Sequence, residues 1–155
     1  MHGTLIAQPT PSLQVFNIRQ TENPILSLYA GSVPAGFPSP AADYMEEEID
    51  FNKLLCPRPS STIVIRATGE SMVGAFIPDQ AYLVVDRSIK PVNNNIIVAV
   101  VNGELTIKRF IKNSSGIRLM PANPKYQPIP ITGDMEFSIW GTVTKIIIDP
   151  LKSSV

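Results

Sequence analysis

The stretch I-I-V-A-V-V-N-G-E-L-T-I-K-R-F-I, residues 96–111, holds two runs of strand-forming residues on either side of Asn102-Gly103. An Asn-Gly pair in this position is the strongest short-range signal for a β-hairpin, because both residues accept the positive φ that a two-residue turn requires. The stretch therefore predicts two antiparallel strands, over residues 96–101 and 105–111, joined by a tight turn.

Short runs of the same composition occur on both sides of this hairpin, over residues 62–67, 82–86, 116–121 and 136–148. Segments containing Asn, Gly, Pro and Asp separate them, as is typical of turns between strands. No helical pattern of 10–15 residues lies between the runs, which argues against a fold of alternating strands and helices. We therefore predict an all-β fold, a mostly antiparallel β-sandwich or partly open barrel.

The N-terminal part of the chain has a different character. Residues 1 to about 32 contain scattered apolar side chains without a clear period, so we interpret them as an extended arm. A stretch typical of a linker follows, Ser32–Tyr44, in which three prolines surround Ala35-Gly36 and hold the backbone extended. Beyond it, Asp43–Leu55 is predicted to form one or two helical turns, with its three glutamates facing solvent.

Charge and hydropathy exclude several classes of protein. The chain has 155 residues, with 13 basic and 13 acidic side chains and no basic run, so binding to nucleic acid through phosphate contacts is not expected. Its longest apolar run, residues 96–101, is far shorter than the roughly 20 residues that span a bilayer, and the N-terminus lacks the pattern of a signal peptide. The single cysteine, Cys56, rules out an internal disulfide and suits a reducing compartment. We expect a soluble cytoplasmic protein.

The residue types also limit the possible chemistry. The only histidine is His2, in the arm, so a Ser-His or Cys-His site on the folded body is nearly ruled out. The sequence has no Cys/His cluster that would bind zinc and no glycine-rich phosphate loop. We therefore expect no metal and no cofactor, and a hydrolase of acyl bonds would need a lysine as its base.

Two stretches supply the residues for such a site. T-G-E-S-M, residues 68–72, follows a predicted strand, where Ser71 can expose its hydroxyl while neighbouring amides form an oxyanion hole. In G-E-L-T-I-K-R-F-I, residues 103–111, alternation places Lys108 on one face of an apolar strand, where burial would lower its pKa. Each pattern also has a structural interpretation: a simple turn, and a lysine that extends its amine to water. Taken singly, each pattern favours the structural interpretation.

Five stretches taken together form a more specific pattern than Ser71 or Lys108 alone. They occur in unbroken order within about residues 35–148, and Lys108 follows Ser71 by 37 positions. They are G-F-P-S-P-A-A-D-Y (36–44), G-E-S-M (69–72), V-V-D-R-S (84–88), G-E-L-T-I-K-R (103–109) and M-P-A-N-P-K-Y (120–126). Together they resemble the LexA/UmuD family of self-cleaving serine peptidases of the bacterial SOS response, and its UmuD-like members in particular, which share the separation of 37.

The resemblance implies roles for individual residues. Ser71 would be the nucleophile and Lys108, neutral when active, its general base. The bond that each chain cuts would be Ala35–Gly36, and the backbone amides of Glu70 and Ser71 would hold the oxyanion. The cut would divide the chain into two parts. The first part, residues 1–35, would be an arm that self-cleavage removes.

The remainder, residues 36–155, would be a peptidase domain that also serves as a polymerase accessory subunit. The resemblance further implies a homodimer that is stimulated to cut itself by a RecA filament on single-stranded DNA. The trimmed homodimer would then join an error-prone Y-family polymerase subunit of the UmuC type in translesion synthesis.

Three alternatives remain open at this point. A LexA-type transcriptional regulator would need a DNA-binding domain before the cut, and the 34 or so residues there show no helix-turn-helix pattern. A signal peptidase, which also pairs serine with lysine, would need a membrane anchor. A non-catalytic β-fold interaction module would make Ser71 and Lys108 purely structural.

Overall fold

The structure is a computed structural model that describes residues 14–17, 25–29, 32–38, 40 and 46–152. His2 and the first three residues of the predicted helix, 43–45, lie outside the described residues. The chain forms two compact units. The larger unit contains residues 1–18 and 58–155, and the smaller unit contains residues 19–57.

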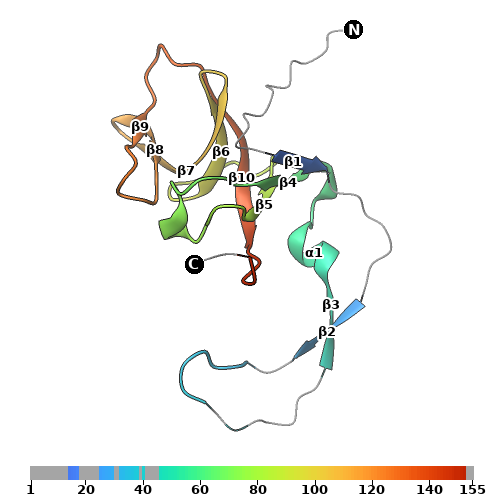
Figure 1. Cartoon of the computed structure of the whole chain (residues 1–155). Coiled ribbons are helices and arrows are strands. Elements are labelled where there is room, and N and C mark those ends of the chain that lie inside the picture. The colour runs from blue at the N-terminus through green and yellow to red at the C-terminus, as the bar shows by residue number, and fades with distance from the viewer. Residues whose placement is uncertain (1–13, 18–24, 30–31, 39, 41–45, 153–155) are drawn as a thin grey trace. The chain divides into compact units, whose positions relative to one another are not determined.

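The larger unit is built on one eight-stranded sheet in which every pairing is antiparallel. The strand order is β1-β4-β5-β10-β6-β7-β8-β9, so the long strand β10 lies in the middle, between β5 and β6 (Figure 1). The strands are β1 (Gln14–Asn17), β4 (Thr62–Arg66), β5 (Tyr82–Asp86), β6 (Ile96–Val101), β7 (Glu104–Asn113), β8 (Gly116–Met120), β9 (Ile129–Pro130) and β10 (Phe137–Ile147). Two short 3-10 helices, η1 (Pro59–Ser61) and η2 (Val73–Ala75), flank β4.

The predicted fold class is confirmed, because the described chain is mostly an open antiparallel sheet with very little helix. The hairpin expected at Asn102-Gly103 joins β6 to β7, with φ values of 50° and 82° at the two turn residues. All six strands predicted beyond residue 61 are present, and β9 is an additional two-residue strand.

Both faces of the sheet are buried at β6. Its alternate residues Ile97 and Ala99 join one apolar cluster with Phe110 and Leu119. Val98, between them in sequence, joins the larger cluster on the other side. That cluster also contains Ile65, Ala67, Met72, Ala75, Ile77, Ala81, Leu83 and Val85. Ile65, near the end of β4, therefore shares a core with the central strands.

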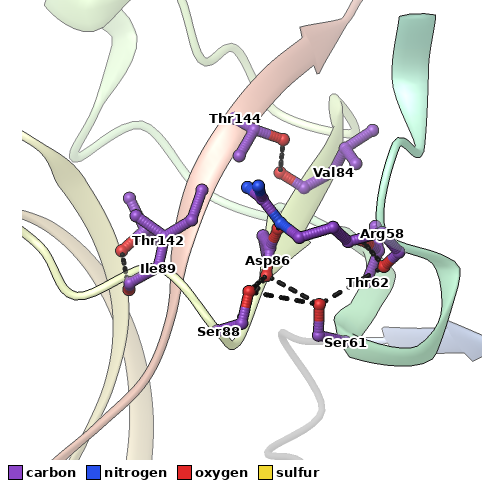
Figure 2. Close-up of polar contacts among 9 residues, drawn as sticks. All are labelled: Arg58, Ser61, Thr62, Val84, Asp86, Ser88, Ile89, Thr142 and Thr144. Atoms are coloured by element: carbon purple, nitrogen blue, oxygen red, sulfur yellow. Dashed lines mark hydrogen bonds and ion pairs between the residues drawn. The ribbon is translucent and has the colours of Figure 1, made fainter. Parts of the chain in front are cut away.

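A buried carboxylate fixes the segment just before β4 to the end of β5 (Figure 2). Asp86 is only 2% exposed, and its Oδ2 accepts a hydrogen bond from Arg58 Nε at 2.6 Å. Its Oδ1 accepts hydrogen bonds from Ser61 Oγ at 2.9 Å and from the backbone and hydroxyl of Ser88 at 2.8 and 2.7 Å. We call these four residues the Asp86 cluster.

The ionised form of Asp86 is the stable one in this setting. Burial by itself would raise the pKa of the carboxyl, because a charge in a low-dielectric interior is poorly solvated. The hydrogen bonds from Ser88, Arg58 and Ser61 outweigh that effect and lower the pKa far below its ordinary value. Asp86 is therefore a structural anion that holds the 58–61 segment in place.

The smaller unit contains a two-stranded sheet and a short helix. β2 (Ile25–Tyr29) pairs antiparallel with β3 (Glu46–Asp50), and α1 (Phe51–Leu55) follows directly. Asp50 caps this helix, since its Oδ1 accepts hydrogen bonds from the backbone of Asn52 at 2.9 Å and of Lys53 at 3.2 Å. No helix in the described residues is long and apolar enough to cross a bilayer.

The helix predicted over Asp43–Leu55 is wrong for Glu46–Asp50, which forms β3 instead. Glutamates favour a helix locally, but here the strand pairs along its whole length with β2, which lies far from it in sequence. The helical prediction holds only for Phe51–Leu55, beyond the Asp50 cap.

Candidate active site

The turn after β4 presents Ser71 on a backbone that bends sharply. Gly69 has a φ of +86°, a backbone conformation that residues with a Cβ rarely adopt, so glycine suits the position. Its N–H donates a hydrogen bond to Asp79 Oδ1 at 2.7 Å, which ties the turn to the loop before β5. Met72, next to the serine, is buried in the larger core. The turn therefore has one side chain in the core and the neighbouring serine at its surface.

The segment after β8 holds this turn by its backbone. The N–H of Ala122 donates to the carbonyl of Ser71 at 2.8 Å, and the N–H of Gly74 donates to the carbonyl of Ala122 at 2.7 Å. Asn123 Nδ2 donates to the carbonyl of Glu70 at 2.9 Å. A Cβ at Gly74 would lie 2.4 Å from the Ala122 oxygen, so a side chain there would force the two segments apart.

Lys108 approaches Ser71 from β7. Its Nζ lies 3.1 Å from Ser71 Oγ, 3.0 Å from Thr106 Oγ1 and 2.9 Å from the backbone oxygen of Ile107. Lys108 is only 8% exposed, and none of the ion pairs found within the described residues involves it. Burial lowers the pKa of this amine, because no opposite charge compensates for the lost hydration of the ammonium.

Either protonation state of the Lys108 amine can make the three contacts. A neutral amine has two N–H groups and one lone pair, whereas an ammonium has three N–H groups and no acceptor. Thr106 Oγ1 and the carbonyl of Ile107 can accept from the two N–H groups. An ammonium would donate its third N–H to Ser71 Oγ, whereas a neutral amine leaves its lone pair for the Ser71 hydroxyl to donate to. The latter is the arrangement that a general base needs in order to remove the serine proton.

An open pocket of about 150 Å³ lies over these groups. Its walls combine the serine turn with the start of β7, and they present both polar and apolar groups. The lining residues are Ala67, Thr68, Gly69, Ser71, Met72, Ile77, Leu105, Thr106, Ile107 and Lys108. Burial among these groups disfavours the charged ammonium of Lys108, while the opening leaves the Ser71 hydroxyl accessible.

The structure brings two of the predicted site residues together, whereas the roles of the others stay predictions. Ser71 and Lys108 lie within hydrogen-bond distance, as a dyad requires, although their catalytic roles remain a prediction. Ala35 and Gly36 are exposed residues of the smaller unit, in the connection between β2 and β3. For Glu70 the structure shows a backbone carbonyl held by Asn123, and the oxyanion role of the Glu70 and Ser71 amides stays a prediction.

Thr106 is the site residue that the sequence interpretation missed as a partner of Lys108. The signal was available, because residues two apart on a strand share a face. A hydroxyl at that spacing can reach the end of a lysine side chain. Within the described residues, no three His, Cys, Asp or Glu side chains gather as a metal site would require.

The family follows from a comparison of the whole sequence. A family model described as Peptidase S24-like matches residues 27–144, a range that includes the Ser71 turn, Lys108 and the Ala35–Gly36 bond. The chain belongs to the Peptidase S24-like family. SamA of Salmonella typhimurium strain LT2 is 42% identical over 120 residues, which cover 77% of this chain and 83% of SamA. MucA of Escherichia coli is 36% identical over 125 residues, which cover 80% of this chain and 85% of MucA.

A third relative is named as a repressor. The LexA repressor of Clostridioides difficile is 42% identical over 117 residues, which cover 75% of this chain but only 54% of the repressor. The predicted resemblance to the LexA/UmuD family is confirmed, and this S24 peptidase is a UmuD-like member of the SOS mutagenesis group. Membership supports a self-cleaving serine peptidase in general.

Proposed function

We propose that this S24 peptidase cuts its own Ala35–Gly36 bond, with Ser71 as the nucleophile and Lys108 as the general base. The observation that carries the proposal is the 3.1 Å distance between Lys108 Nζ and Ser71 Oγ at a buried amine that has no ion-pair partner in the described chain. A lysine kept for structure alone would gain more from reaching solvent or a carboxylate.

The reaction proceeds in two stages. Neutral Lys108 accepts the proton of Ser71 Oγ while that oxygen bonds to the carbonyl carbon of Ala35, and the backbone amides of Glu70 and Ser71 stabilise the oxyanion. The Ala35–Gly36 C–N bond then breaks, and Lys108 gives its proton to the nitrogen of Gly36. In the second stage water attacks the ester on Ser71, with Lys108 again accepting a proton and returning it to Oγ.

The segment around the bond suits a substrate. All of residues 32–38 are exposed, and Val33 and Phe37 are 81% and 93% exposed. Small residues on both sides of the bond allow close approach of the backbone to a nucleophile. The flanking prolines keep the segment extended before it binds, which reduces the entropy lost on binding.

The biological setting is part of the same proposal. A RecA filament on single-stranded DNA favours the state in which the cleavage segment occupies the pocket, and so accelerates the cut by shifting a population. The trimmed chain, residues 36–155, then works as a homodimeric accessory subunit of an error-prone Y-family polymerase of the UmuC type. The matches to SamA and MucA, each over more than four fifths of the relative, support this role.

A LexA-like regulator is the second candidate, supported by the 42% identity to the repressor of Clostridioides difficile. The match spans about half of that repressor but 83% of SamA, which favours the accessory role. A gel-shift assay on operators of damage-inducible genes separates the two. Sequence-specific binding by the intact chain would support the regulator instead.

The test of the dyad is incubation of the purified full chain at alkaline pH, followed by mass spectrometry. We expect a new N-terminus at Gly36, and no product from Ser71→Ala or Lys108→Arg, because a guanidinium stays charged. Lys112→Arg, at an exposed lysine of the same strand, is the matched control and should cleave like the wild type. Product formation by Ser71→Ala or Lys108→Arg contradicts the assignment. Addition of RecA, single-stranded DNA and a nucleotide at neutral pH tests the stimulation.

A further inference from the structure

One edge of the larger sheet is formed by a strand of the arm. β1 is the outermost strand and pairs only with β4, with Phe16 opposite Val64. β1 precedes the Ala35–Gly36 bond and β4 follows it. We propose that β1 is a removable cap on the β4 edge, and that its release after self-cleavage opens this edge to an extended, uncharged strand of another protein that carries an aromatic side chain. The timing of the release rests on the proposed cleavage, whereas the cap itself does not.

The contacts of Phe16 show what the edge accepts. The guanidinium of Arg66 lies 5.7 Å from the centroid of the Phe16 ring and 4.9 Å from that of the Tyr82 ring. The two ring centroids are 6.0 Å apart and the rings are tilted by 59°. Arg66 also donates a hydrogen bond to the Tyr82 hydroxyl. Because Arg66 and Tyr82 follow the cleavage bond, they remain after the arm has gone, as a platform for one aromatic side chain.

The pairing of β1 is weak enough to depend on the covalent tether. It involves four residues, and Phe16 stays 40% exposed. A cation–π contact at such an exposed site is weak, and so short a strand pair is marginal by itself. In the intact chain residues 18–61 connect the two strands, which gives an effective concentration of about millimolar. A cut within that connection leaves the arm held only by two short strand pairs, β1 with β4 and β2 with β3, so we expect the arm to dissociate at micromolar protein.

The uncovered edge has the character of a docking site for a strand. β4 has the sequence T-I-V-I-R, without a proline or an acidic residue, and two of its residues, Thr62 and Ile65, are buried. Its outward N–H and C=O groups would lose their partners with β1, and unpaired groups of this kind recruit another strand. β1, with the sequence Q-V-F-N, supplies the template for the occupant: no charge, and an aromatic residue opposite Val64.

Hydrogen exchange of the full chain tests the cap without any need for cleavage. In the Ser71→Ala background, Phe16→Pro removes both the ring and a backbone N–H of β1. We expect those β4 amides that face β1 to exchange about tenfold faster in the double variant, and the β4 amides that face β5 and the amides of β8 to be unchanged. Equal protection of β4 in both chains overturns the cap. If the double variant responds but the wild type is never cut, the proposed function fails and the cap stands.

A synthetic peptide with the sequence of residues 10–21 tests the occupant. Excess peptide should restore the protection of β4 in the double variant and leave the Ser71→Ala chain unchanged, because its edge is already covered. A peptide with alanine in place of Phe16 should require about a fivefold higher concentration for the same protection, since the aromatic contact contributes roughly 1 kcal/mol. Equal potency of the two peptides overturns the aromatic requirement.

Two arginine variants make the test specific to this edge. Arg66→Ala in the double variant should weaken the peptide effect several-fold. Arg87→Ala should leave it unchanged, although Arg87 also lies over a ring, 5.4 Å from that of Trp140. Protection of β4 that returns with rising protein concentration and without peptide would identify a second copy as the occupant, and so overturn the proposal of a different partner.

Discussion

Lys108 and Asp86 are both buried ionisable side chains of the larger sheet, and the structure treats them in opposite ways. Lys108 is surrounded by neutral oxygens and keeps a pKa below that of an ordinary lysine because burial disfavours its charge. Asp86 is more buried still, yet it receives an arginine, two hydroxyls and a backbone N–H, and it stays ionised. Burial alone therefore does not decide charge; the partners do.

The contrast separates a group with the properties of a base from a structural one. A buried base without a counter-charge has an available lone pair, which is useful in chemistry and costs stability. A buried acid with several donors is chemically inert and contributes to stability. Three predictions follow the contrast, beginning with the largest effect.

The first prediction concerns the pH dependence of self-cleavage. The rate should rise about tenfold per pH unit while Lys108 is mostly protonated, since only the neutral amine acts as a base. It should level off once the pH exceeds the pKa of Lys108, which burial places below the ordinary 10.5. Rates from pH 6 to 11, measured by mass spectrometry with Lys112→Arg as the control, give the profile. A rise that continues unchanged through 10.5 would mean that burial does not lower this pKa.

The second prediction breaks the Asp86 cluster. Asp86→Asn should lower the free energy of unfolding by about 2–3 kcal/mol at neutral pH, because the amide offers one acceptor oxygen where Arg58, Ser61 and Ser88 need two. Urea unfolding measures the effect. Asp149→Asn is the control. The side chain of Asp149 is half-exposed and its Oδ2 lies 3.9 Å from Lys152 Nζ, so its free energy of unfolding should change by less than about 0.5 kcal/mol.

The same variant has a distinctive pH dependence. The folded pKa of Asp86 lies below its ordinary value of 3.8, so the unfolded chain binds more protons as the solution becomes acidic. The stabilisation by Asp86 is present above about pH 4 and is lost as the pH falls further. The difference between wild type and Asp86→Asn should therefore shrink in acid; a constant difference would show that the carboxylate charge is not what stabilises the cluster.

The third prediction is the smallest and has the opposite sign. Lys108→Met should raise the free energy of unfolding by about 1–2 kcal/mol at neutral pH, because an apolar side chain fits the site without the cost of burying an amine. The gain should decline as the pH rises toward 10.5, where the unfolded chain also loses the proton. Lys112→Met, on the exposed part of β7, should change stability by less than about 0.5 kcal/mol. A destabilised Lys108→Met would show that the amine contributes to the fold.

The sheet was predictable because its strands carry their own signals. Beyond residue 61 the β-branched runs and turn residues coincide with the strands, as the Asn102-Gly103 turn illustrates. β1, β2 and β3 were not predicted, because each owes its conformation to a partner distant in sequence: β4 for β1, and β2 and β3 for each other. Four-residue and glutamate-rich segments have no local pattern that reveals such pairing.

The candidate site was predictable in part. The serine turn and the lysine strand were visible as patterns, and their 37-residue separation matched the family, but the distance between the two side chains needed the fold. The Asp86 cluster was not predicted, because its members are common residue types brought together only by the pairing of β4 with β5. V-V-D-R-S contributed to the resemblance without any indication that its aspartate would be buried.

The backbone bonds between Ser71, Gly74 and Ala122 divide the loop that carries Ser71 into fixed and changeable positions. At Gly74 not even a methyl group is accommodated, whereas Val73 and Phe76 are 42% and 79% exposed. Main-chain bonds, together with the side chains of Asp79 and Asn123, thus hold the turn that carries Ser71. Substitutions of the outward side chains of this loop can therefore change the surface around Ser71 while the backbone geometry of the turn is retained.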